Sequence, residues 1–232
     1  MAVTARSFVD EFDDAVPRLQ DLWLTPVAGG LDALRDRLVQ SLVPPWSDPG
    51  VDDAAEQVRP ELWSWFQLER AATPGLEAVR IVLHRMDADG ELKLTNLFPV
   101  HGSGRIEREA YNRVVRDFRD TVVRPLEREE VVRARLSDDA ESFATWVGED
   151  AVRALARFSL LANKSTGAGH PRDEERWNDF LLMALPARRP GFVGALEQVL
   201  VRNGWSEDGA SDLVIAAEQI EAYERRRREH TH

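Results

Sequence analysis

The 232-residue chain has no cysteine, only two lysines and two tyrosines, and no long run of apolar residues. The lack of cysteine excludes disulfide scaffolds, cysteine-based zinc sites, iron–sulfur clusters and thiol nucleophiles. No stretch reaches about 18 consecutive apolar residues, so the sequence predicts no membrane-spanning helix. The first residues also lack a basic segment followed by an apolar run, so we expect no secretory signal and a cytoplasmic location.

Acidic residues outnumber basic ones by 41 to 30, which gives a formal net charge of −11 at pH 7. Nucleic acids and anionic membranes repel such a chain on average, so nucleic acid is disfavoured as a partner and no membrane contact is expected. The hydrophobic fraction of 43% is normal for a folded protein. Nearly all basic residues are arginine, a bias typical of a GC-rich bacterial coding sequence.

Leucines recur at helical spacing in the N-terminal part, which predicts helical structure over residues 5–42. Two prolines should divide this stretch into shorter helices, because proline breaks a helix interior. A loop rich in proline and glycine follows at residues 44–50. The leucines are Leu31, Leu34, Leu38 and Leu42, and the prolines are Pro17 and Pro26.

Apolar and polar residues alternate from residue 61, a pattern typical of strands. We interpret residues 61–98 as an antiparallel three-stranded meander whose middle strand, Val79–Met86, is apolar on both faces. The turn at residues 87–90 partly matches a calcium loop. That register, however, places Arg85 and Asn96 where calcium needs carboxylates, so a plain hairpin turn is favoured.

Two tryptophans, Trp63 and Trp65, lie on one face of the first predicted strand, with His84 on the next strand. Such side chains could form a stacking pocket. Large aromatic residues at strand spacing more often pack against neighbouring elements, so packing on the N-terminal helices is the favoured interpretation.

A helix is predicted over residues 106–123, after a connector that contains two glycines. Its apolar stripe should pack on the meander, and Pro125 should end the helix. Residues 131–136 alternate again and predict a fourth strand with one face in water. The stripe consists of Tyr111, Val115, Phe118 and Val122.

Every signal from residue 138 onward is helical. Residues 151–162 are apolar nearly all round and predict a buried helix, and three amphipathic helices follow. The predicted fold class is α+β, with N-terminal helices, an antiparallel meander plus a fourth strand, and a C-terminal helical bundle. We expect residues 1–137 to form the α+β part, with a three- to four-stranded sheet, and residues 138–232 to form a helical part packed on it as one compact unit.

The common catalytic and metal-binding signatures are missing from the sequence. It has no pair of histidines at metal-ligand spacing on a helix, no Gly-x-Ser-x-Gly elbow and no Walker loop. Gly102 and Gly104 could bring backbone amides close to a phosphate, but a plain connector fits the sequence better. We therefore expect no metal and no cofactor.

Four arginines fall on one side of the 106–123 helix and could meet an anionic partner. Glu109 and Asp120 lie on the same side at ion-pair spacing, so a self-paired, solvated face is favoured. A second basic run, Arg225–Arg228, lies near the C-terminus. A nucleic-acid-associated factor is thus the second alternative function, disfavoured by the net charge. The four arginines are Arg105, Arg108, Arg116 and Arg119.

The segment after the predicted buried helix concentrates polar side chains where a short linker would suffice. Pro171 should open the next helix with His170 at its cap, so free amides and the Lys164 cation could bind a phosphate or carboxylate. The alternative interpretation is structural, with both helix ends capped and an Asp173–Arg176 bridge. The candidate ligand-binding residues are Asn163, Lys164, Ser165, Thr166, His170, Asp173 and Arg176.

The first functional hypothesis is a cytoplasmic binding or regulatory module, which contacts a protein partner or holds a small anionic ligand at residues 163–176. The alternative is an enzyme acting on a phosphate or acyl ester, with His170 as acid or base and Lys164 stabilising charge. The missing catalytic signatures favour the binding module. Neither the ligand nor the oligomeric state follows from the sequence.

The 163–176 loop is expected to be ordered, because apolar helices flank it on both sides. Its buried polar side chains must then find partners. We predict a connected network of Asn163, Ser165 or Thr166, Asp173 and Arg176. Lys164 or His170 should remain reachable from solvent.

Overall fold

The computed structural model describes residues 12–50, 65–86, 90–101, 104, 106–165 and 169–229. About 50% of the chain is helix and 22% is strand, and the predicted α+β class is confirmed. The described chain divides into two compact units, one made of residues 18–139 and the other of residues 12–17 with 140–229. The first is therefore an insertion in the sequence of the second, and the expected packing as one compact unit stays a prediction.

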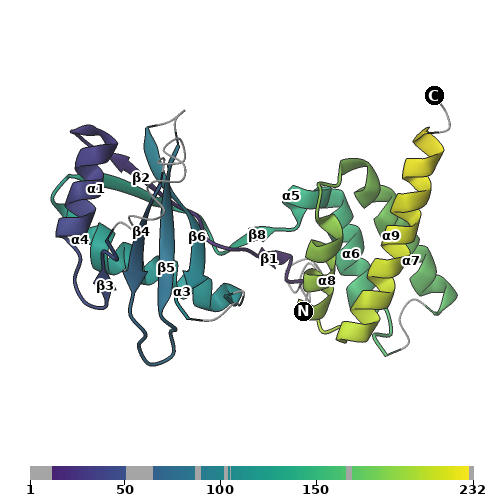
Figure 1. Cartoon of the computed structure of the whole chain (residues 1–232). Coiled ribbons are helices and arrows are strands. Elements are labelled where there is room, and N and C mark those ends of the chain that lie inside the picture. Colours follow the sequence, from purple (N-terminus) through teal and green to yellow (C-terminus); the bar gives the residue numbers. More distant parts are fainter. Residues whose placement is uncertain are drawn as a thin grey trace, which may run out of the picture. The chain divides into compact units, whose positions relative to one another are not determined.

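A six-stranded antiparallel sheet forms the framework of the inserted unit (Figure 1). The predicted meander is present as its strands β4, β5 and β6, which pair in that order. The strand order across the sheet is β3-β4-β5-β6-β2-β7. The strands are β2 (Leu22–Pro26), β3 (Trp46–Ser47), β4 (Trp65–Arg70), β5 (Val79–Met86), β6 (Glu91–Pro99) and β7 (Val132–Leu136).

The helical prediction for residues 5–42 is wrong over two segments, which form the strands β1 (Ala15–Pro17) and β2. In β2, Leu22 and Leu24 are fully buried while Trp23 between them is only half-buried, which is the two-residue period of a strand. β2 forms backbone hydrogen bonds with β6 on one side and β7 on the other, and this strand pairing outweighs the helical spacing of the local sequence. Within residues 12–42, the described part of this stretch, only α1 (Gly30–Gln40) is helical.

One face of this sheet carries the core of the inserted unit. Alternate residues of the strands point into it, among them Leu68, Ile81 and Leu94. The predicted apolar stripe of the 106–123 helix is buried against them, and the leucines of α1 join the same cluster. The helical residues in the core include Leu31, Leu34, Leu38, Tyr111, Val115, Phe118 and Val122.

The helix that carries this stripe does not end at Pro125. It runs as α3 (Arg108–Phe118), widens into a π-helical turn η3 (Arg119–Val123) and continues as α4 (Arg124–Arg128). Proline has no amide hydrogen and its ring crowds the carbonyl four residues earlier, here that of Thr121. The wider turn contains Thr121, and Arg124 donates its amide hydrogen to the carbonyl of Arg119.

Tyr111 on α3 offers a direct test of this packing. Burial is the main cause that raises the pKa of its phenol to about 12, and the nearby Asp21 carboxylate raises it further. The raised value means that ionisation opposes folding, so stability is full below the ordinary pKa near 10 and falls as pH rises toward 12. In a Tyr223→Phe background Tyr111 is the one tyrosine left. Its ultraviolet absorbance should then titrate near pH 12, whereas a midpoint near 10 would contradict the burial.

The helical unit combines a two-stranded ribbon with five helices in its described part (Figure 1). The ribbon pairs β1 with β8 (Ala140–Ser142). The expectation that only helices follow residue 138 is therefore wrong at β8, because its strand partner lies about 125 residues earlier in the chain. The helices are α5 (Ala144–Val147), α6 (Glu149–Leu161), α7 (Pro171–Ala187), α8 (Phe192–Arg202) and α9 (Glu207–Glu229).

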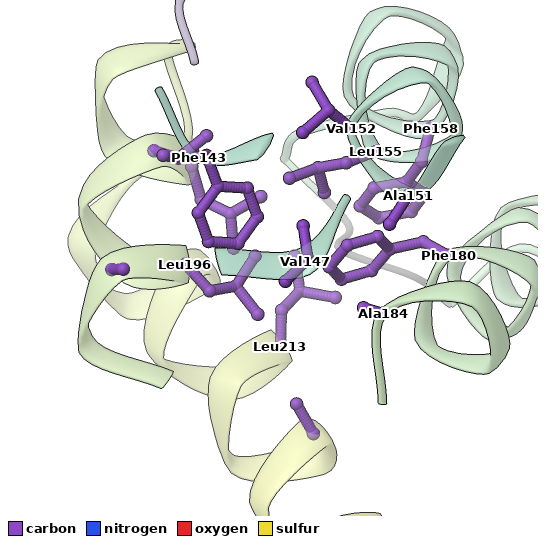
Figure 2. Close-up of a cluster of buried hydrophobic side chains, with 14 of the residues drawn as sticks. Phe143, Val147, Ala151, Val152, Leu155, Phe158, Phe180, Ala184, Leu196 and Leu213 are labelled. Carbon is purple, nitrogen blue, oxygen red and sulfur yellow. The ribbon is translucent and has the colours of Figure 1, made fainter. Parts of the chain in front are cut away.

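Side chains from all five helices converge in a single core (Figure 2). The ring of Phe158 on α6 lies 5.1 Å from that of Trp177 on α7 and 5.2 Å from that of Trp205. The Trp205 Nε1 also donates a hydrogen bond of 2.9 Å to the buried Ser159 hydroxyl. The predicted burial of residues 151–162 holds for one side of α6 only. Arg153 and Arg157, which interrupt its apolar pattern, face solvent, and so do Leu160 and Leu161.

Candidate functional site

The 163–176 loop begins α7 as the sequence predicts. His170 is the N-cap residue, and its Nδ1 accepts a hydrogen bond of 3.2 Å from the Arg172 amide. Pro171 is the first residue of the helix, where its missing amide hydrogen costs nothing. The imidazole is exposed. One of the two side chains predicted to face solvent therefore does so.

Two polar pairs occupy the ends of the loop. The Asn163 Oδ1 accepts hydrogen bonds from the Ser165 amide, at 3.1 Å, and from its hydroxyl, at 2.7 Å. The buried Asp173 carboxylate pairs with Arg176 at 2.7 Å. Thr166 lies outside the described residues, so the single network expected to join these pairs stays a prediction.

Lys164 has a structural partner that the sequence did not suggest. Its Nζ donates to the carbonyl oxygen of Asn203, the residue that ends α8. The last carbonyls of a helix have no partner within it and carry partial negative charge, so a lysine there stabilises the end. The loop after α6 is thereby tied to the turn between α8 and α9.

Replacing Lys164 with methionine should lower the free energy of unfolding of the helical unit by about 1–2 kcal/mol, because a charged hydrogen bond to a helix end is lost. Urea denaturation followed by circular dichroism measures the change. The exposed Arg172→Met is the control, and equal stability of both variants would show that the contact contributes nothing.

The outer face of the sheet carries an aromatic residue between two cations. Trp23 on β2 lies opposite Lys93 on β6 and Arg135 on β7. The Lys93 Nζ is 5.0 Å from the centroid of the indole, and the Arg135 Cζ is 3.8 Å from it. Asp21 pairs with Lys93 at 3.1 Å and Glu91 lies 3.8 Å from Arg135, so the cations are balanced within the fold.

The side chains of this cluster have their partners within the fold. The indole already has both cations as ring partners, and each cation has a carboxylate beside it. In the predicted tryptophan pair, the backbone of Trp65 lies opposite His84, and Trp63 lies outside the described residues.

The basic stripe on the 106–123 helix is paired in part, since the Arg119 Nε is buried without a hydrogen-bond partner among the described residues. Arg116 bonds to Asp139 at 3.1 Å, and Asp120 pairs with Arg124 at 3.4 Å. Arg105 lies outside the described residues. These pairs fit the self-paired, solvated face that the charge spacing predicts.

A pocket of about 310 Å³ opens at the other end of the same helix. The start of β5, the end of β6 and the first turns of α3 enclose it. Val79 and Val114 are almost completely buried, so they join its floor to the core of the inserted unit. The apolar lining residues are Leu76, Val79, Pro99, Ile106, Ala110 and Val114.

Three polar side chains line the pocket as well: Glu77, His101 and Glu107. The sequence pattern indicates the glycine connector beside the pocket but not these three residues. Their proximity follows from the meander, because Val79 pairs with Pro99 and the Val100 amide bonds to the Ala78 carbonyl at 2.9 Å. Residues just before β5 and residues just after β6 must therefore lie close together at one end of this strand pair.

Other kinds of site find no support in the described part of the chain. No group of three or more histidine, cysteine, aspartate or glutamate residues there could hold a metal ion. None of the described helices is both long enough and apolar enough to cross a membrane. The turn that resembled a calcium loop lies partly outside the described residues, so its hairpin interpretation stays a prediction.

Comparison with known proteins gives one partial match, in the helical unit. Residues 151–232 match the model of a family described as "Domain of unknown function (DUF1889)". No curated protein and no solved structure matches the chain. The matched segment is less than half of the chain and contains the whole 163–176 loop, whereas the pocket lies in the inserted unit. The chain is thus similar to this family over helices α6 to α9.

Proposed function

We propose that this protein is a binding module that holds a small molecule in the pocket between β5, β6 and α3. The observation that carries the proposal is the pocket itself, which has apolar walls and three polar side chains. A volume of about 310 Å³ is at the lower end of the range of pockets that bind small ligands. Its apolar floor is held by Val79 on β5, Pro99 on β6, and Ala110 and Val114 on α3, whereas its polar side chains lie on the segments that lead into and out of these elements.

The 163–176 loop is a weaker candidate for a ligand-binding site. Lys164, His170 and Asp173 each have a partner within the fold, and the first two stabilise helix ends. A ligand would have to replace these contacts, whereas the pocket offers unfilled space. A cytoplasmic location is part of the proposal, supported by the absence of cysteine.

A nuclear magnetic resonance screen of small fragments tests this function with the full chain. Fragments that bind should shift the backbone amide signals of residues 76–79, 100–101 and 106–114. Ala110→Leu places a larger side chain in the pocket and should abolish these shifts, while Ala33→Leu on the exposed side of α1 should keep them. Absence of any bound fragment, or binding confined to residues 163–176, would contradict the proposal.

A further inference from the structure

We infer that the ligand of this pocket is a small primary amine with a short apolar body, an inference that rests on the proposed function. The charges around the pocket give the first reason. Of the described residues that line it, two carry carboxylates, Glu77 and Glu107, and none is a lysine or arginine. A positively charged group is the chemical complement of such a lining.

The second reason is that these two carboxylates are unpaired in the described part of the chain. Neither Glu77 nor Glu107 makes a side-chain hydrogen bond or ion pair with another described residue. Several acids elsewhere in the inserted unit do pair with arginine, as Asp117 does with Arg70 at 2.8 Å. Both carboxylates are exposed and line the pocket, so an outside cation can reach them there without displacing a described arginine.

The first turn of α3 is the feature that opposes a cation. A helix N-terminus carries a partial positive charge of roughly +0.5, which falls off within one turn. Two full carboxylates, one of them on the N-cap residue Glu107, outweigh this partial charge. The charges of the described lining residues therefore favour a cation, and the His101 imidazole adds one hydrogen-bonding group.

The walls determine the rest of the ligand. Val79, Val114 and the other apolar residues offer no partner for a polar body, so the part of the ligand below its amine must be apolar. The structure thus assigns a head group that pairs with Glu77 and Glu107 and a body that replaces water on the apolar floor. Both features occur in arylalkylamines and short alkylamines.

Three probes with the same apolar body separate these contributions: phenethylamine, 2-phenylethanol and 3-phenylpropionate. Each is titrated into the isotope-labelled full chain, and dissociation constants are taken from amide shifts of residues 76–79, 100–101 and 106–114. We expect phenethylamine to bind about tenfold more tightly than 2-phenylethanol, as one charge-assisted contact would give. The carboxylate probe should bind most weakly.

The double variant Glu77→Gln, Glu107→Gln should bring phenethylamine and 2-phenylethanol to similar affinities without changing the fold. Glu197→Gln, at an exposed position on α8, is the matched control and should keep the full preference. Equal binding of all three probes by the unaltered protein, or tightest binding of 3-phenylpropionate, would overturn the amine inference while leaving the pocket as a binding site. Failure of every probe and of the fragment screen would overturn the proposed function too.

Discussion

Phe158→Ala should destabilise the helical unit by about 3–5 kcal/mol, the range measured for removing a fully buried phenylalanine. The ring has no exposed surface and contacts both Trp177 and Trp205 at about 5 Å, so the variant leaves a cavity between three elements. A loss of this size is a large part of the stability of a typical domain. Urea denaturation followed by circular dichroism measures it.

Arg157→Ala is the matched control for this variant. Arg157 is the preceding residue on α6 and is exposed, so its removal should change the free energy of unfolding by less than about 0.5 kcal/mol. Comparable losses from Phe158→Ala and Arg157→Ala would mean that the faces of α6 are assigned wrongly.

Phe118→Ala should destabilise the inserted unit by a similar amount, about 3–5 kcal/mol. Phe118 has no exposed surface, and its ring lies 5.0 Å from that of Trp46 at an angle of 58°. Arg116→Ala on the same helix should cost only about 0–1 kcal/mol, since its ion pair with Asp139 is exposed. Equal losses from the two variants would reverse the orientation of α3.

The two phenylalanine variants also test the division into units. Hydrogen exchange of backbone amides reports stability locally. Phe118→Ala should speed exchange mainly within residues 18–139, and Phe158→Ala mainly within residues 140–229. Equal acceleration throughout the chain by either variant would show that the two units unfold together.

Sequence periodicity predicts burial correctly where a helix or strand packs one face against a hydrophobic core. The stripe of α3 and the inward residues of α7 are buried as their periods predict, whereas β5, expected to be apolar on both faces, buries only alternate residues. The start of α7 could also be predicted, because it depends on His170 and Pro171, which are neighbours in the chain. The candidate site was harder, because the loop that looks most polar in sequence uses its side chains for helix ends.

The α+β class, the meander and the helices that follow residue 138 could be predicted from the sequence, because each depends on a local period or on strands that are neighbours in the chain. Only the tertiary structure decided that β2 is a strand, since its partners Leu92–Leu94 and Val132–Leu136 lie about 70 and 110 residues away. The same reason applies to Lys164, whose partner Asn203 is 39 positions further on. It applies as well to the pocket, where Glu77 and His101 meet because two strands pair between them and Glu107 joins them from the helix beyond.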